Sequence, residues 1–330
     1  MTENSLNETE VRLQQLFVRT ASSHSDAIAL VFEDRRISFF ELQLYVEWMA
    51  GYFQSIHLQS GQRVALLMGN SPKLVISLFG LWYAGGVAVP LDVAGDEAAL
   101  CSQLELAGVS IIVTTPEYKT KLDRALAKIC EDSSTRSPFT IAIFEEDNIV
   151  TLNAKLRHRR TQPGADKPAR PLFEVSDAAA ENFAAIYFES DLESRASTHE
   201  ELARAAAAMV TRMQLSAHEG LICFAPLSQQ NNLRGCLLAT IAAGATLVIA
   251  EAKDWDQLEE NLAEENVTVA VGPAALLLRL AKKNAAKLAT WRWYFYTDAA
   301  LSPEIGERLP RRTGLRIEPL TDAIANAILK

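Results

Sequence analysis

The chain has 330 residues, 49% of them hydrophobic and 22% charged, which is ordinary for a soluble globular protein and enough for two lobes. Its net charge of −9 argues against nucleic acid or an anionic membrane as the main partner, and no apolar run reaches the roughly 18 residues of a membrane span. The N-terminal residues, MTENSLNETEV, are polar and acidic and exclude a secretory or mitochondrial signal, so we expect a cytoplasmic protein.

Short apolar runs alternate along the chain with longer stretches whose apolar positions recur at helical spacing. The first half predicts strands at 27–32, 63–68, 87–91, 110–115 and 139–144, and the second half predicts strands at 184–189, 221–226, 245–250, 267–271 and 293–298. Helical stretches such as 71–84 and 198–214 lie between most of them. Continuous apolar strands joined by helices are typical of parallel sheets with both faces covered. We therefore expect an α/β fold with two lobes of mostly parallel sheet flanked by helices.

Residues 154–171, AKLRHRRTQPGADKPARP, interrupt this alternation. They carry six Lys or Arg residues, three prolines and no periodicity. We interpret them as an exposed, flexible linker, with a docking site for an acidic partner as the alternative. The first lobe then covers residues 1–153, and the second covers residues 172–330.

The two halves also share an internal echo. In each, a glycine begins a strand, a polar loop leads into an apolar helix, and a second glycine ends that helix. The glycine pairs are Gly61 with Gly85 and Gly220 with Gly244, which gives the same offset of 24 residues (85 − 61 and 244 − 220). Either the two lobes share a strand–helix–strand plan, or strand–helix–strand units simply look alike; each alternative would explain the echo.

Several stretches, in their order along the chain, resemble the adenylate-forming superfamily. They read RRISFFELQ, GQRVALLMGNSPKLVISLFGLWYAGGVAVPLD, GATLVIAE, VTVAVGPAALLLRL and DAALSPEIGERLPRRTGLRIEPLTDA. Members of this superfamily include acyl-CoA synthetases, peptide-synthetase adenylation domains and luciferases, and the sequence looks closest to malonyl- and medium-chain acyl-CoA synthetases. The resemblance implies activation of a carboxylate with ATP and Mg²⁺, and then transfer to a thiol. It also implies a β-barrel and a C-terminal lid, which we expect this chain to lack because it ends at Lys330.

The segment after Tyr187 stands where the resemblance implies a phosphate loop of the form YTSGTTGxPKG. Its glycines and its lysine, which would hold phosphate, are gone. The degenerate loop consists of Glu189, Ser190, Asp191, Glu193, Ser194 and Arg195. One carboxylate about 5 Å from a phosphate charge costs roughly 3 kcal/mol at an effective dielectric near 20, so we expect this loop to repel ATP. We favour a solvated acidic turn over a metal site at Glu189, Asp191 and Glu193, and we expect no bound metal.

Two nucleotide motifs are also altered. The adenine-side motif, which resembles GAAPLSPE, reads TDAALSPE here, with Asp298 in place of a glycine and with Ala299 kept. The next motif, YGxTE, reads EPLTD, with Glu318 in place of the tyrosine that stacks on adenine. Thr321 and Asp322 remain at the positions that the resemblance assigns to phosphate and Mg²⁺ binding. We favour an ordinary helix N-cap pair for these two residues over a retained binding role.

A further motif, PLFHxxG, borders the acyl pocket in the resembling enzymes. Here it reads PLSQQNN, and its histidine and last glycine are lost. Ser228, Gln229 and Asn232 either bind a polar ligand in that pocket or simply form a polar loop before a helix that begins near Leu233.

No confident catalytic residue emerges from the sequence. None of the five histidines accompanies a Ser or Cys nucleophile in a recognisable elbow, and we expect His199 to lie at the surface. The losses favour a degenerate, non-catalytic AMP-binding domain that needs no cofactor. Such a domain would be an interaction, scaffold or regulatory subunit, or a binder of a small acyl or carboxylate ligand. The alternative is a carboxylate-adenylating ligase, dependent on ATP and Mg²⁺, that a separate C-terminal domain completes.

The closing segment, LTDAIANAILK, predicts a helix with one apolar stripe. Leu320, Ile324, Ala327 and Ile328 lie at helical spacing along it. The stripe either folds back onto its own chain or meets another protein surface. Because large apolar patches rarely stay exposed, we expect a homodimer or a protein partner to bind through this helix.

Overall fold

The computed structural model describes residues 12–132, 139–145, 148–153, 156–161, 182–188, 194–250, 265–284, 287–298, 309–311 and 313–328. Its strands are β1 (Ile28–Phe32), β2 (Arg35–Ser38), β3 (Arg63–Leu67), β4 (Val87–Pro90), β5 (Ile111–Thr114), β6 (Thr140–Phe144), β7 (Ile149–Asn153), β8 (Leu156–Thr161), β9 (Phe183–Phe188), β10 (Ser194–Thr198), β11 (Gly220–Cys223), β12 (Thr246–Ile249), β13 (Val267–Gly272), β14 (Trp293–Tyr296) and β15 (Arg316–Pro319). Its helices are α1 (Leu13–Ser23), α2 (Phe39–Ser55), α3 (Pro72–Tyr83), α4 (Glu97–Ala107), α5 (Pro116–Asp132), α6 (His199–Met213), α7 (Gln230–Asn232), the π-helix η1 (Leu233–Leu238), α8 (Ala239–Ala243), α10 (Ala274–Asn284), the 3₁₀ turn η3 (Lys287–Thr290) and α12 (Leu320–Ile328).

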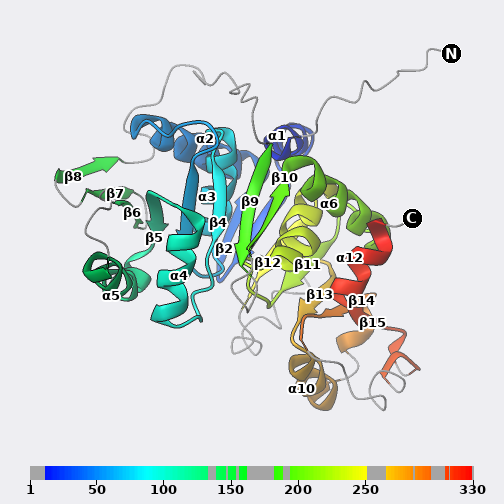
Figure 1. Ribbon diagram of the computed structural model, residues 1–330. Coiled ribbons are helices and arrows are strands. Elements are labelled where there is room, and N and C mark those ends of the chain that lie inside the picture. Colours follow the sequence, from blue (N-terminus) through cyan, green and yellow to red (C-terminus); the bar gives the residue numbers. More distant parts are fainter. Residues whose placement is uncertain are drawn as a thin grey trace.

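Two mostly parallel sheets organise these elements (Figure 1). The seven-stranded sheet has the order β15-β14-β13-β11-β12-β1-β2, and the eight-stranded sheet has the order β10-β9-β4-β3-β5-β6-β7-β8. Antiparallel pairing is confined to the edges, at β1–β2, β9–β10 and β6–β7–β8. Neither sheet closes into a barrel within the described residues. The expected α/β fold, with two mostly parallel sheets flanked by helices, is confirmed.

The two sheets exchange strands between the halves of the chain. β1 pairs in parallel with β12, with Leu30 opposite Leu247, so residues 28–38 belong to the sheet of the second half. β9 pairs with β4 and carries residues 183–198 into the sheet of the first half. A buried parallel strand is equally apolar beside any neighbour, so the sequence pattern does not reveal this exchange. The lobe boundaries at 153 and 172 stay a prediction, but the sheets do not divide there.

Part of the predicted linker is a strand. Residues 156–161 form β8, which pairs antiparallel with β7 at the edge of the eight-stranded sheet. The prediction of a flexible connection is therefore wrong for this part of 154–171, whereas residues 162–171 lie outside the described residues. The sequence LRHRRT lacks the apolar alternation of a buried strand, and charged residues are typical of sheet edges. An edge strand of this composition gives no strand signal.

The internal echo corresponds to two equivalent strand–helix–strand units. β3, α3 and β4 form one unit, and β11, the helix from Gln230 to Ala243, and β12 form the other, with each strand pair adjacent and parallel. Both helices are followed by a glycine in the left-handed region, with φ of 76° at Gly85 and 69° at Gly244. That conformation favours glycine because it has no Cβ. The shared plan is therefore present in the structure.

One apolar core lies between the two sheets and receives residues from both. Val64 and Leu66 of β3 point into it, whereas Ala65 and Leu67 point into an outer cluster with residues of α4 and α5. A third cluster packs α10 and η3 against the seven-stranded sheet. Both faces of these strands are thus buried, which explains their continuous apolar sequences. No helix in the described part of the chain is long and apolar enough to span a membrane.

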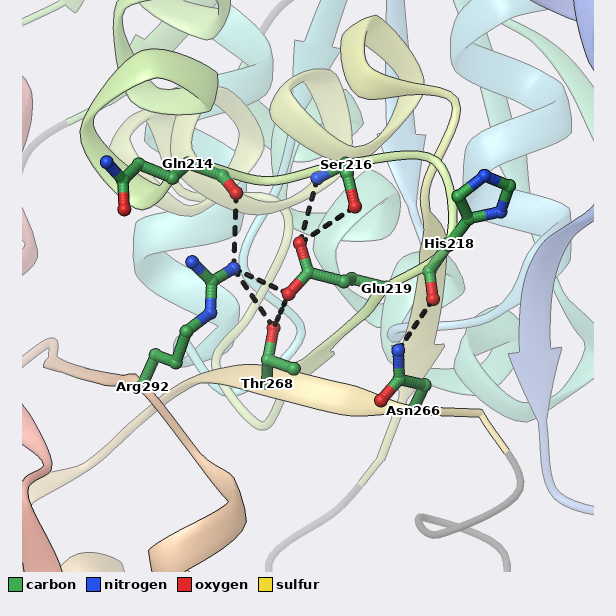
Figure 2. Close-up of polar contacts among 7 residues, drawn as sticks. All are labelled: Gln214, Ser216, His218, Glu219, Asn266, Thr268 and Arg292. Carbon is green, nitrogen blue, oxygen red and sulfur yellow. Dashed lines mark hydrogen bonds and ion pairs between the residues drawn. The ribbon is translucent and has the colours of Figure 1, made fainter.

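The amino ends of the second-half strands are held by the carboxylate of Glu219, which immediately precedes β11 (Figure 2). Glu219 accepts hydrogen bonds from the backbone N–H and the hydroxyl of Ser216, both at 3.0 Å, and from the Thr268 hydroxyl at 2.9 Å. Its ion pair with Arg292 measures 2.6 Å. These contacts join the end of the α6–β11 connection to β13 and to the start of β14. Both oxygens of the Glu219 carboxylate therefore bind groups that stabilise this end of the sheet.

The apolar stripe of the C-terminal helix is buried within its own chain where it is described. Leu320, Ala323 and Ile324 are at most 3% exposed and belong to the core between the sheets. The helix, α12, lies beside α6 (Figure 1). Of the two alternatives for this stripe, Leu320 and Ile324 take the first and fold back onto their own chain, whereas a partner bound through this helix stays a prediction. The side chains of Ala327 and Ile328 lie outside the described residues.

His199 is buried, which corrects the expectation of a surface position. It is the first residue of α6, is 6% exposed, and accepts a hydrogen bond at Nδ1 from the backbone N–H of Leu13 at 3.4 Å. Its ring also meets the indole of Trp82 edge to face, with the ring centroids 6.2 Å apart. Burial, helped by the nearby charge of Arg12, lowers the pKa of His199 from 6.5 to about 4. A neutral imidazole therefore joins α1 to α6.

This lowered pKa predicts a loss of stability in acid. Native His199 stays neutral down to about pH 4, whereas in the unfolded chain it binds a proton from about pH 6.5 downwards. Its contribution is therefore complete above pH 6.5 and falls by about 3 kcal/mol in total as the pH drops to about 4. Urea unfolding of wild type and His199→Asn at pH 7 and pH 4 measures this contribution. The two proteins should converge in stability at pH 4, and a constant difference between them would contradict the assignment.

Candidate functional site

The altered motifs gather at one edge of the seven-stranded sheet. β11, β13, β14 and β15 run parallel, so the loops after them leave from the same edge. These loops contain residues 226–232 after β11 and Asp298 after β14, and α12 begins directly after β15. In open α/β sheets, ligands bind outside the carboxyl ends of the strands. This edge is therefore the candidate site.

Part of the predicted site lies outside the described residues. This holds for Glu189, Ser190, Asp191, Glu193 and Ala299, so the acidic phosphate-loop segment stays a prediction. Ser194 and Arg195 are described, and both are exposed at the start of β10. Among the described residues, no group of three or more His, Cys, Asp or Glu side chains could hold a metal ion.

Asp298 caps a neighbouring helix. Its Oδ1 accepts a hydrogen bond of 2.7 Å from the backbone N–H of Ala274, the first residue of α10. A carboxylate at a helix N-terminus satisfies an otherwise unpaired donor and is favoured by the helix dipole. The side chain that stands where the resemblance places a glycine therefore has a structural role.

Glu318 is bound to the helix that covers the sheet. Arg212, in the last turn of α6, donates to both of its carboxylate oxygens, with Nε–Oε1 at 3.0 Å and Nη2–Oε2 at 2.5 Å. This bidentate pair raises the pKa of the Arg212 guanidinium. The guanidinium of Arg212 also lies 5.0 Å from the ring centroid of Trp293, and that of Arg316 lies 5.1 Å from it. Glu318 thus completes a charged layer between β14, β15 and α6.

Thr321 and Asp322 are exposed in the first turn of α12. Their position agrees with the predicted helix start, where a carboxylate is favoured by the dipole. Nearby, burial together with the charges of Asp322 and Glu318 raises the pKa of Tyr296. Unlike Asp298 and Glu318, Thr321 and Asp322 are exposed and have no hydrogen bond described above.

The loop at 226–232 is held by its own polar groups. Asn232 is 1% exposed, and its amide donates to the Pro226 carbonyl at 2.8 Å and to Gln229 Oε1 at 3.1 Å. Asn70 joins this loop to the other sheet, because its side chain donates to the Ala225 carbonyl at 2.7 Å and accepts from the Leu227 N–H at 2.8 Å.

The other two predicted loop residues make fewer described contacts. Gln229 is exposed and Ser228 is half-buried. The helix after the loop begins at Gln230, three residues before the predicted start near Leu233.

A polar cluster that the sequence motifs do not reveal lies beyond this loop. Gln230 Nε2 donates to the hydroxyl of Ser197 at 2.7 Å, and Arg234 Nη2 donates to the same oxygen at 3.0 Å. Gln230 and Arg234 are separated by one helical turn, on a segment that is otherwise mostly apolar. That spacing is a weak signal of a shared polar face. Ser197 lies on β10, so the contact joins η1 to the eight-stranded sheet.

Burial perturbs two ionisable groups in this cluster. Tyr187 is 4% exposed, and its burial raises the pKa of its hydroxyl, an effect that the charge of Arg234 opposes. Burial lowers the pKa of Arg234, as does the charge of Arg195, whereas the Tyr187 and Glu201 side chains act in the other direction. The Tyr187 hydroxyl and the Arg234 Nε have no hydrogen-bond partner among the described residues, although both atoms are buried.

The sequence matches the protein family described as AMP-binding enzyme over residues 17–323. It is 23% identical over 310 residues to 4-coumarate–CoA ligase 3 of Arabidopsis thaliana, an alignment that covers 88% of this chain and 52% of the relative. It is 33% identical over 102 residues to the long-chain-fatty-acid–CoA ligase of Bacillus subtilis, covering 31% of this chain and 18% of the relative. The chain thus spans about half, or much less, of the length of these curated relatives.

A similar fold occurs in the inhibitor-bound N-terminal domain of FACL13 from Mycobacterium tuberculosis. The TM-score is 0.72 at 15% sequence identity, and the comparison covers 93% of this chain and 75% of that domain. At this identity the likeness concerns the fold.

The structural role of Glu318 predicts a loss of stability when it is changed. Glu318→Gln removes the charge and one acceptor of a partly buried bidentate pair, so the free energy of unfolding should fall by about 1–2 kcal/mol in urea titrations at neutral pH. Glu200→Gln, at an exposed position on α6, is the matched control and should change it by less than about 0.5 kcal/mol. Equal stabilities of both variants and wild type would show that the pair contributes nothing.

Proposed function

The chain belongs to the AMP-binding enzyme family, and from that premise we propose that it is a carboxylate-binding member that no longer adenylates its ligand. The ligand class comes from the family, because relatives such as 4-coumarate–CoA ligase 3 are named for a carboxylate. As a binder without nucleotide chemistry, the domain would serve as a regulatory, scaffold or interaction subunit. It would need neither ATP nor Mg²⁺.

The observation that carries this proposal is the ion pair of Glu318 with Arg212. Glu318 stands where the resemblance places a tyrosine that stacks on adenine. A carboxylate has no aromatic face, and this one is held by α6. Asp298, which replaces a glycine on the same side, is held by the N-terminus of α10. Two positions that the resemblance assigns to nucleotide contacts therefore carry carboxylates, Glu318 and Asp298, that bind other parts of the same chain.

The second candidate is a carboxylate-adenylating ligase that uses ATP and Mg²⁺ and is completed by a separate C-terminal domain. Thr321 and Asp322 favour it, because both are exposed at the candidate edge and match the family residues for phosphate and Mg²⁺. The chain also spans only about half the length of relatives such as 4-coumarate–CoA ligase 3. In such a ligase this chain would provide Thr321 and Asp322, and a separate chain would provide the C-terminal lid.

Pyrophosphate release separates the two candidates. The assay uses the natural full-length protein, so that any segment flanking residues 1–330 is present, with Mg–ATP and a panel of short, medium-chain and aromatic carboxylic acids. We expect no release above the blank with any acid, because acidic groups occupy the adenine side of the site. The Arabidopsis thaliana ligase with 4-coumarate serves as the positive control. Release that depends on one of the acids would refute the proposal and establish the ligase.

A further inference from the structure

The cluster around Arg234 contains two buried donors without acceptors. Both the Nε–H of Arg234 and the hydroxyl of Tyr187 lack a hydrogen-bond partner in the described part of the chain. Leaving a buried donor unpaired costs free energy, and the cost is larger for a charged group. Native structures seldom retain such groups unless a ligand, an ion or water satisfies them. Two of them in one cluster indicate an acceptor that binds there.

Strand register brings these two donors together. β10 runs antiparallel to β9, with Arg195 opposite Tyr187 and Ser197 opposite Ala185. Ser197 and Tyr187 are therefore diagonal neighbours on one face of the sheet, about 7–8 Å apart. Arg234 donates to the Ser197 hydroxyl at 3.0 Å, so its guanidinium lies over the same face. The two unpaired donors therefore belong to neighbouring side chains on one face of the sheet.

The segment that carries Arg234 is a π-helix, η1, from Leu233 to Leu238. Its wider turn is rare and often marks functional sites. Gln230, one turn earlier, also donates to Ser197, which keeps that hydroxyl engaged and fixes one end of the guanidinium. The Arg234 side chain is half-buried. The donors are thus held in place before any ligand arrives.

The local charge favours a single negative charge on the ligand. Arg195 and Arg234 are positive, Glu201 is negative, and all three influence one another or the Tyr187 hydroxyl. Their sum, counted over the described residues, is one positive charge. A monocarboxylate neutralises it, whereas a phosphate dianion would leave an excess negative charge in a partly buried place. Tyr187 and Leu233 also belong to the apolar core, which suits an alkyl chain next to the carboxylate.

We propose that a small monocarboxylate binds between Arg234 and Tyr187, its oxygens accepting hydrogen bonds from the guanidinium Nε–H and the phenol O–H. The class of ligand rests on the proposed function, and the place of binding rests on the two unpaired donors. Binding needs no nucleotide, because neither donor belongs to the altered adenine motifs. Ser197 and Gln230 position the guanidinium and do not contact the ligand.

Titration with sodium acetate and sodium butyrate, followed by NMR and by the thermal midpoint, tests this site. No nucleotide is present. Wild type should bind butyrate saturably, and Tyr187→Phe, which removes only the hydroxyl, should weaken binding about tenfold. Arg234→Met should abolish it. Arg204→Gln and Tyr45→Phe are the matched controls, at an exposed arginine of α6 and at a tyrosine of α2 outside both the cluster and the candidate edge, and both should bind like wild type.

The outcomes that overturn the proposal are distinct. No saturable response of wild type to either acid at tens of millimolar would show that water alone satisfies the donors. Butyrate binding that Tyr187→Phe and Arg234→Met leave unchanged would place the ligand elsewhere. Saturable binding of inorganic phosphate in place of both acids would overturn the ligand class. Pyrophosphate release by the full-length protein would refute only the proposed function and leave a carboxylate at this site unaffected.

Discussion

The burial of one face of each sheet in a common apolar core is the constraint on which the rest of the structure depends. Val64 of the eight-stranded sheet and Val269 of the seven-stranded sheet belong to one cluster with α3, α6, η1 and α12. Because the core is shared, the halves cannot separate without exposing it. It also means that a polar group on the inner faces needs a partner to offset its burial. Arg212 finds one in Glu318 and His199 finds one in the Leu13 N–H, whereas Arg234 is paired at Nη2 and unpaired at Nε within the described residues.

Most of the acidic and polar residues described at the candidate edge form hydrogen bonds or ion pairs with other parts of the chain. Glu318 neutralises Arg212, Asp298 caps α10, and Asn232 closes the loop after β11. Each of these groups would have to leave its partner before it could serve a ligand. The Arg234 cluster is different, because donors there stay unpaired within the described residues. This contrast between satisfied and unsatisfied polar groups is the basis of the proposal that the chain binds a carboxylate and not a nucleotide.

The sequence predicts the fold class and ten of the described strands, because continuous apolar runs are direct evidence of buried parallel strands, but it misses β2, β7, β8, β10 and β15. It does not predict which strands are neighbours, and β1 and β9 each join the sheet of the other half. It also misplaces His199 and leaves open where the stripe of Leu320 packs, since their burial depends on segments far away in the chain. The contact of Arg234 with Ser197 is missed for the same reason. Local patterns encode elements, whereas long-range packing decides which polar residues meet.

The most direct test of the account is a calorimetric titration of this chain with Mg–ATP. If Glu318 and Asp298 have replaced the nucleotide contacts, no saturable heat should appear below the millimolar range at neutral pH. The Arabidopsis thaliana 4-coumarate–CoA ligase 3 serves as the reference. Micromolar affinity of this chain for Mg–ATP would contradict the central claim that the fold has lost its nucleotide site.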